Sequence, residues 1–164
     1  MSLRNAFKSA AAVLGTLMLG FATSANAATA TTTFQVTATV QATCTISAGA
    51  LAFGPYTGAL ISSTSTITVT CTNTSPYNVG LNPGATTGAT VTTRQMLNGG
   101  AKLNYALFQD SGYTKNWGQT VGTDTEAGTG NGAAQTLTVY GQVAAGQYPN
   151  PGSYTDTVTA TVTY

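Results

Sequence analysis

The sequence predicts an all-β domain, a sandwich of seven or eight short strands. Apolar and polar residues alternate with a period of two in several runs, which is the pattern of half-buried strands. Threonine, valine and tyrosine are frequent and favour strands, and glycine, proline and asparagine separate the runs. After residue 27 no long helical period and no βαβ rhythm interrupts this pattern. The spacing of the runs is typical of a β-sandwich.

The expected strands follow one another along the chain with short connections. The run at 102–109 has apolar residues on both faces, which indicates a central strand. Glycine and threonine dominate 85–93 and 121–133, and two prolines fall within 144–151, so these segments are expected to be loops. The predicted strands cover residues 32–46, 64–72, 77–81, a short stretch ending in the turn at 97–100, 102–109, 135–143 and 153–164.

Two alternating runs stand at the ends of this pattern. Residues 154–164 place five threonines on one face, and the chain ends with this run. A similar run occupies residues 32–41. A strand exposed at a sheet edge promotes aggregation unless something covers it. One interpretation is that the two runs pair with each other and close an ordinary sandwich. The other is that each is incomplete in its own subunit and is completed by a neighbour, as in strand addition between chains.

Residues 1–27 have the features of a secretory signal. Arg4 and Lys8 precede an apolar run from Ala10 to Phe21 that is too short to span a membrane. Residues 25–27 form a small-x-small cleavage site. The alternatives are a membrane anchor or a buried helix. The signal predicts export, with a mature chain that begins at Ala28.

The mature chain is almost uncharged, with a net charge of −1 from three basic and four acidic residues. This balance gives no electrostatic basis for binding nucleic acid or anionic lipid. Disorder is also disfavoured, because it usually accompanies high net charge and few β-branched residues. The charged residues are Arg94, Lys102, Lys115, Asp110, Asp124, Glu126 and Asp156.

The chain has two cysteines, Cys44 and Cys71, which both lie in the apolar phase of a predicted strand. An exported chain with two cysteines usually pairs them. A disulfide closing a loop of this size would stabilise the fold by roughly 3 kcal/mol. Two free thiols are the alternative.

Residues suited to catalysis are scarce. The chain has no histidine, which excludes Ser-His and Cys-His mechanisms and histidine-bound metals. The acids are scattered, and the glycine-rich segment 128–132 lacks the Lys-Ser/Thr of a phosphate loop. Trp117 and the tyrosines are either core residues or a sugar-binding platform, and burial in the core is the commoner role. We therefore expect no enzyme, no cofactor, no metal and no small-molecule substrate.

Four motifs, in this order, resemble the spore coat protein U domain family. They begin with the run from Phe34 to Ile46 followed by Leu-Ala-Phe-Gly-Pro-Tyr at 51–56. The middle motif runs from Leu103 to Asp110 and leads to Trp-Gly at 117–118. The last two are residues 137–142 and the segment from 151 to the C-terminus. The resemblance covers nearly all of the mature chain.

That family includes the major subunits of archaic chaperone–usher pili. The resemblance implies an incomplete immunoglobulin-like sandwich of the pilin type, completed by donor-strand exchange. It implies a donor strand at 28–42, a domain at 43–164, and a Cys44–Cys71 disulfide. The implied donor side chains are Phe34, Val36, Ala38 and Val40, and the implied wall of the acceptor groove is Val158, Ala160, Val162 and Tyr164.

The resemblance also implies partners and a location. A periplasmic chaperone would lend a strand, an outer-membrane usher would export the subunit, and copies of related subunits would form a surface fibre for adhesion or biofilm formation. The alternatives are a spore or cyst coat protein assembled by the same contact and a lectin-like tip adhesin. A tip adhesin normally carries a further receptor domain, whereas this sequence predicts one domain and a donor strand.

Overall fold

The computed structural model describes residues 26–164. The chain divides into two units, Met1–Ala38 and Thr39–Tyr164. In the described part of the first unit, residues 26–38 belong to no helix or strand, and all of them are exposed. The predicted export signal lies outside the described residues, apart from residues 26 and 27.

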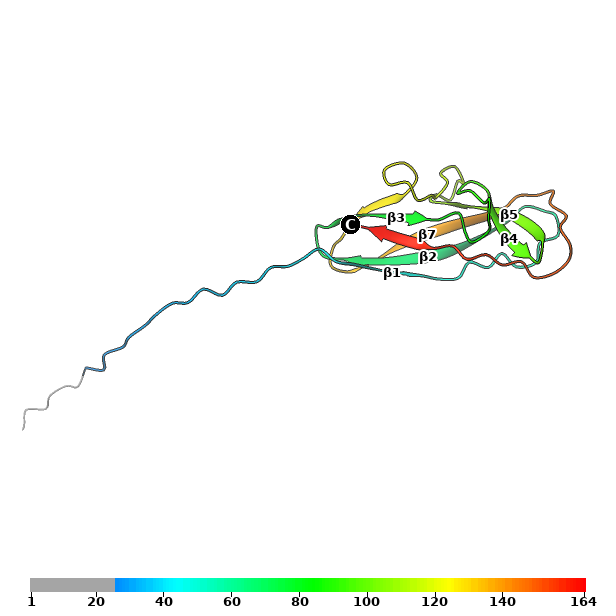
Figure 1. Cartoon of the computed structure of the whole chain (residues 1–164). Helices are drawn as coiled ribbons and strands as arrows, with labels where there is room; N and C mark the ends of the chain where they lie inside the picture. Colours follow the sequence, from blue (N-terminus) through cyan, green and yellow to red (C-terminus); the bar gives the residue numbers. More distant parts are fainter. Residues whose placement is uncertain (1–25) are drawn as a thin grey trace, which may run out of the picture. The chain divides into compact units, whose positions relative to one another are not determined.

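Thr39–Tyr164 forms two antiparallel β-sheets (Figure 1). No helix occurs in the described part of the chain. The five-stranded sheet has the order β1-β2-β7-β5-β4, and the three-stranded sheet has the order β6-β3-β8. The strands are β1 (Cys44–Ala48), β2 (Ile61–Cys71), β3 (Pro76–Leu81), β4 (Arg94–Asn98), β5 (Ala101–Phe108), β6 (Glu126–Thr129), β7 (Ala134–Val143) and β8 (Ala160–Thr163).

The core lies between the inner faces of the two sheets. Val69 on β2, Val143 on β7 and Val79 on β3 are completely buried. Trp117 is 1 % exposed, and its indole nitrogen donates a hydrogen bond to the Val79 carbonyl oxygen at 2.8 Å. The tryptophan is therefore a core residue that ties the β5–β6 connection to β3, and it forms no surface platform.

The all-β prediction is confirmed, and β5 is an inner strand of its sheet, between β7 and β4. One predicted loop was wrong in part, because residues 121–133 contain β6. This short strand pairs with β3, and Gly128 lies directly opposite Tyr77. A Cβ atom at Gly128 would overlap the Tyr77 ring. The glycine content that suggested a loop instead allows a strand to pass close to an aromatic side chain.

The two terminal runs differ from their predicted bounds. The run predicted at 32–46 becomes a strand only from Cys44 onward. The run predicted from residue 153 pairs as a strand only at Ala160–Thr163, preceded by an isolated bridge between Thr155 and Leu97. Both differences have one reason, which is that a strand requires a neighbouring strand along its length.

Candidate functional site

The candidate site is the outer edge of β8, together with the half-buried side chains around it. In an immunoglobulin-like sandwich, strands A, B, E and D form one sheet and strands C, F and G form the other. Here β1, β2, β7 and β5 occupy the first four positions, and β3 and β8 occupy C and F. In the described part of the chain, β8 ends its sheet, and no strand occupies position G beside it. The backbone of β8 on this side is therefore open to a further strand.

Half-buried apolar side chains border this open edge. Val158, Ala160 and Val162 alternate with exposed threonines and pack against the core. On the other side of the edge, Ile46 of β1 and Phe53 after it also pack against the core and remain partly exposed. Val69 of β2 and Val79 of β3, which are covered on all sides, have no exposed surface. The residues at the open edge lack that coverage, so an added apolar strand would bury them further.

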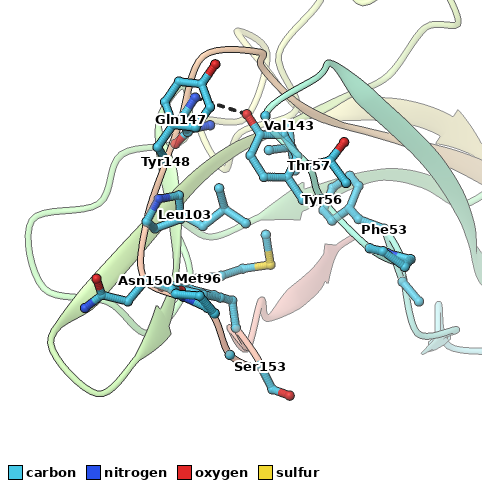
Figure 2. A pocket seen from close by; sticks show the side chains of 18 of the residues that line it. Phe53, Tyr56, Thr57, Met96, Leu103, Val143, Gln147, Tyr148, Asn150 and Ser153 are labelled. Atoms are coloured by element: carbon cyan, nitrogen blue, oxygen red, sulfur yellow. Dashed lines mark hydrogen bonds between the residues drawn. The ribbon is translucent and has the colours of Figure 1, made fainter.

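A pocket of about 730 Å³ lies at one end of this edge (Figure 2). Phe53 and Tyr56, in the β1–β2 connection, form one side, and the β7–β8 connection forms the other. Met96 of β4 and Leu103 of β5 lie between the two sides. Tyr154, which begins the C-terminal alternating run, also lines the pocket, as does Phe53.

Several polar groups around the pocket already have partners within the protein. The Tyr56 hydroxyl donates to the Ala144 carbonyl oxygen at 2.7 Å and accepts from the Gln147 backbone nitrogen at 3.1 Å. The Gln147 side chain exchanges two hydrogen bonds with the Asn104 backbone, at 2.8 and 2.9 Å. The Tyr154 hydroxyl donates to the Asn150 carbonyl oxygen at 2.6 Å. These groups hold the two sides of the pocket in place, and the surface that remains for an occupant is partly polar and partly apolar.

The structure shows where each predicted site residue lies. Phe34, Val36 and Val40 are 85, 81 and 82 % exposed, and Ala38 is also exposed. Among the predicted acceptor residues, Val158, Ala160 and Val162 lie together at the open edge, whereas Tyr164 is 59 % exposed.

A disulfide joins Cys44 and Cys71, which lie directly opposite each other on β1 and β2 with a Cα–Cα distance of 4.1 Å. It connects two neighbouring strands of one sheet. It also lies at the start of β1, immediately after the exposed segment that contains Val40. The covalent link therefore fixes the first residue of the sandwich against β2.

Sequence reasoning missed two parts of this site. The pocket-lining residues 51–56 were noticed only as part of a family motif, although their closely spaced Leu51, Phe53 and Tyr56 were a signal of apolar surface. Arg94 was counted only as a charge, yet it is completely buried. Nothing in the local sequence distinguishes it from an exposed arginine.

The described residues contain neither a metal-binding cluster of histidine, cysteine and acidic side chains nor a helix long and apolar enough to cross a membrane. The candidate site consists of the open backbone hydrogen-bonding groups of β8 and the half-buried apolar side chains beside them.

Comparison with known proteins agrees with this geometry. The sequence profile of the Spore Coat Protein U domain matches residues 30–161. Protein U of Myxococcus xanthus is 37 % identical over 179 aligned positions, which cover 98 % of this chain and 99 % of that protein. The chain belongs to the Spore Coat Protein U domain family.

A solved structure shows the same fold. It is the CsuC–CsuE chaperone–tip adhesion subunit pre-assembly complex from the archaic chaperone–usher Csu pili of Acinetobacter baumannii. One of its chains is similar to this protein with a TM-score of 0.56 and 26 % sequence identity. The similarity covers 77 % of this chain but only 40 % of that chain. The fold is thus an incomplete immunoglobulin-like sandwich of the pilin type.

Proposed function

We propose that this protein is a structural subunit of an extracellular fibre of the archaic chaperone–usher type, and that it polymerises by donor-strand complementation. The observation that carries the proposal is the open edge of β8 with half-buried apolar side chains beside it, in a chain that also has an exposed alternating segment. In this proposal residues 28–42 of one copy are the donor, and Phe34, Val36, Ala38 and Val40 face the core of the next copy. The acceptor groove is bordered by Val158, Ala160, Val162 and Tyr164.

The last residues of the proposed donor, just before β1, favour a donor from another copy. A donor that filled the groove of its own subunit would have to reverse direction just before β1. Residues 39–43 are Thr-Val-Gln-Ala-Thr and contain no glycine, proline, asparagine or aspartate, the residues that favour tight turns. Thr43 is also held in line with β1, because its backbone nitrogen donates to the Thr72 hydroxyl at 3.0 Å. A neighbouring copy avoids this reversal.

The two ends of the sandwich support a head-to-tail arrangement. Thr43 lies beside Thr72, and Thr163 pairs with Asn78, so the β2–β3 connection marks the end where the donor segment leaves the sandwich and β8 finishes. The pocket lies between the β1–β2 and β7–β8 connections, at the start of the C-terminal run. A donor leaving one end of each subunit and a groove extending to the other end generate a linear polymer.

The energetics suit a stable fibre. Burying Phe34, Val36 and Val40 would contribute about 5–9 kcal/mol before the cost of ordering the donor. Each backbone hydrogen bond to β8 would add about 1 kcal/mol net. These contacts must break together, so dissociation should be slow.

The similarity to a chaperone–subunit complex supports a proposed route of assembly. The subunit would cross the periplasm with a chaperone that fills the same groove, pass an outer-membrane usher, and function at the cell surface in adhesion or biofilm formation. A spore or cyst coat assembled by the same strand exchange is the second candidate, which the match to the Spore Coat Protein U domain favours. Neither role requires a catalytic site or a cofactor.

A pair of matched variants tests the donor assignment. Replacing Val36→Asp and Val40→Asp puts charges on the side chains that face the core, and replacing Thr37→Asp and Thr39→Asp puts the same charges on the opposite face. We expect the valine variant to remain unpolymerised while it still binds chaperone, and the threonine variant to form fibres that resist dissociation by detergent. Electrophoresis of unheated samples measures both. Equal polymerisation of the two variants would show that residues 28–42 are not the donor.

A further inference from the structure

Residues 155–159 connect the two sheets and lead directly into β8. At the start of this segment, Thr155 and Leu97 of β4 exchange two backbone hydrogen bonds, at 2.9 and 3.1 Å. At its end, the Asn82 backbone nitrogen donates to the Thr159 carbonyl oxygen at 3.1 Å, and the Thr159 nitrogen donates to the Asn82 side-chain oxygen at 2.8 Å. We call residues 155–159 the crossover segment. Because β8 pairs on only one side, its position depends strongly on how this segment is held.

Asp156 occupies an unusual position in the crossover segment. Its side chain is half-buried, in phase with Tyr154 and Val158, where the alternating pattern otherwise places apolar residues. One carboxylate oxygen accepts hydrogen bonds from the backbone nitrogens of Ala85 at 2.9 Å and Thr157 at 2.8 Å. The other accepts from the Tyr105 hydroxyl at 2.7 Å. A charge at an inward position is costly unless its hydrogen-bonding capacity is used, as it is here.

A buried cation, Arg94, binds the loop that follows β3, and Asp156 binds the same loop at Ala85. Arg94 is fully buried, and its guanidinium donates to the carbonyl oxygens of Leu81 at 3.0 Å, Asn82 at 3.0 Å and Trp117 at 2.6 Å. It also donates to the Val91 carbonyl oxygen at 2.6 Å. The cation thus fixes the end of β3, the strand on which β8 depends, and the carboxylate of Asp156 fixes the next residues of that loop.

Neighbouring groups favour the charged form of Arg94 and the protonated form of Tyr105. Burial lowers the pKa of the Arg94 guanidinium, and Tyr105, Asp156 and Asp124 oppose that shift. Burial also raises the pKa of Tyr105, and its hydrogen bond to Asp156 raises it further, so this hydroxyl stays protonated and remains a donor. The hydrogen bonds of Asp156 and Arg94 involve both sheets, because Asp156 accepts from Tyr105 on β5 and Arg94 donates to Asn82, which follows β3.

We propose that Asp156 is a positioning residue for strand capture: together with Asn82, it holds the crossover segment and β8 in place while the groove beside β8 is unfilled. This inference rests on the proposed function. A donor strand binds fastest and most tightly to an edge that is already ordered, since ordering it on binding costs free energy. Once a donor pairs with β8 on its free side, the strand is held from both sides, and the contribution of Asp156 to its position becomes smaller.

The test measures capture separately from the stability of the filled groove. In the full mature chain carrying Val36→Asp and Val40→Asp, residues 28–42 cannot act as a donor. Its groove can therefore be titrated with a fluorescent synthetic peptide of residues 30–42. Into this parent we introduce Asp156→Ala, the milder Asp156→Asn, and Tyr105→Phe. Asp110→Asn is the matched control, since Asp110 also accepts backbone hydrogen bonds, from Thr114 and Lys115, but in a loop remote from the crossover segment.

We expect Asp156→Ala to slow peptide capture and to weaken it about tenfold, if only a tenth of the molecules then hold β8 in the competent position. Amide hydrogen exchange should accelerate across residues 157–163 but not in β2 or β7. The melting temperature of the peptide-filled form should change much less, and Asp110→Asn should behave like the parent. If the alanine variant fails to fold, Asp156→Asn and Tyr105→Phe should still show slower and weaker peptide capture and faster exchange at residues 157–163, with smaller effects.

Two outcomes would overturn the inference. Capture by the Asp156 variants at the parent's rate would show that the carboxylate does not prepare the edge. Equal acceleration of exchange in β2, β7 and β8 would show a general loss of stability instead. Failure of the parent itself to bind the peptide would be a different result, because it would refute the proposed function and this inference with it.

Discussion

Two segments of this chain share the same period of two, and they end in different states. Residues 154–162 alternate between half-buried and exposed along their whole length, and the last part of the run pairs with β3. Residues 32–41 show an equally regular alternation, but Phe34, Val36 and Val40 are all more than four-fifths exposed. The alternation marks both as able to form strands, and the presence of a partner strand decides whether they do.

The two segments are complementary, because one has an open strand edge and the other has exposed apolar side chains at strand spacing. The C-terminal run has a neighbour on one side only and leaves apolar surface partly uncovered. The leader, residues 28–42, has apolar side chains at the right period and no strand beside them. The following predictions change one of these segments, the sandwich that holds it, or a loop away from both, in order of expected effect.

The largest effect should come from supplying the leader in cis. Appending residues 30–41 after Tyr164 through a short flexible loop gives β8 an antiparallel neighbour. Several kcal/mol of apolar burial should then raise the melting temperature by about 10 °C or more and prevent polymerisation. A fusion carrying Val36→Asp and Val40→Asp within the appended segment is the control and should melt like the unfused chain. A folded fusion with no gain in melting temperature would show that residues 30–41 do not pair with the open edge of β8.

Removing the buried cation should have the next largest effect. Arg94→Met leaves the carbonyl oxygens of Leu81, Asn82, Val91 and Trp117 without their donor in a buried place, which should cost about 3–5 kcal/mol of unfolding free energy. Denaturant unfolding measures this loss. Lys102→Met, at an exposed position, is the control and should change the unfolding free energy by less than about 0.5 kcal/mol. A loss of similar size in both variants would contradict the role assigned to Arg94.

The disulfide should set where the exposed leader ends and the sandwich begins. Replacing Cys44→Ala and Cys71→Ala together should lower the unfolding free energy by about 3 kcal/mol, since a long loop is no longer closed in the unfolded chain. Exchange of the β1 amides at Thr45 and Ile46 should accelerate most, extending the unpaired state of the leader into β1. A reducing agent should affect the unmutated chain in the same way and leave the double variant unchanged.

The smallest effect concerns a loop away from both alternating segments. Hydrogen bonds, first of all from the Lys115 backbone nitrogen, lower the pKa of Asp110 below its ordinary value of 3.8. Because the folded pKa is the lower one, this group stabilises the loop fully above about pH 4 and loses that effect as the pH falls through the folded pKa. NMR signals of Tyr113 and Thr114 should shift in that acidic range, and Asp110→Asn should abolish the shift. Strand capture by Asp110→Asn at neutral pH should be unchanged.

Much of the architecture could be predicted from local pattern. Residues 64–72, 77–81, 102–109 and 135–143 were predicted as strands, and each prediction coincides with an observed strand to within a few residues. The predictions succeeded because these segments are inner strands whose buried face repeats every second residue. They failed at β6, where Gly128 packs under Tyr77, because nothing local indicates that an aromatic ring from another strand lies there.

The candidate site was predictable only in part. The alternating residues at 158–162 were assigned from their period together with the family resemblance, and they do lie at the open edge. The pocket between the β1–β2 and β7–β8 connections was not predicted, since it brings together segments about ninety residues apart in the chain. The inward carboxylate of Asp156 interrupts the apolar phase, a visible irregularity whose meaning depends on Tyr105 and Ala85, which are distant in sequence.

The all-β class, the period of most strands, the near absence of charge and the family could be predicted from the sequence alone, because these follow from residue type and spacing. Which strands are neighbours, which edge stays open, and which backbone groups Arg94 and Asp156 bind at and after the end of β3 depend on the tertiary structure. The physical reason is that side-chain period is a local property, whereas pairing is fixed by the whole set of long-range contacts that bury the core.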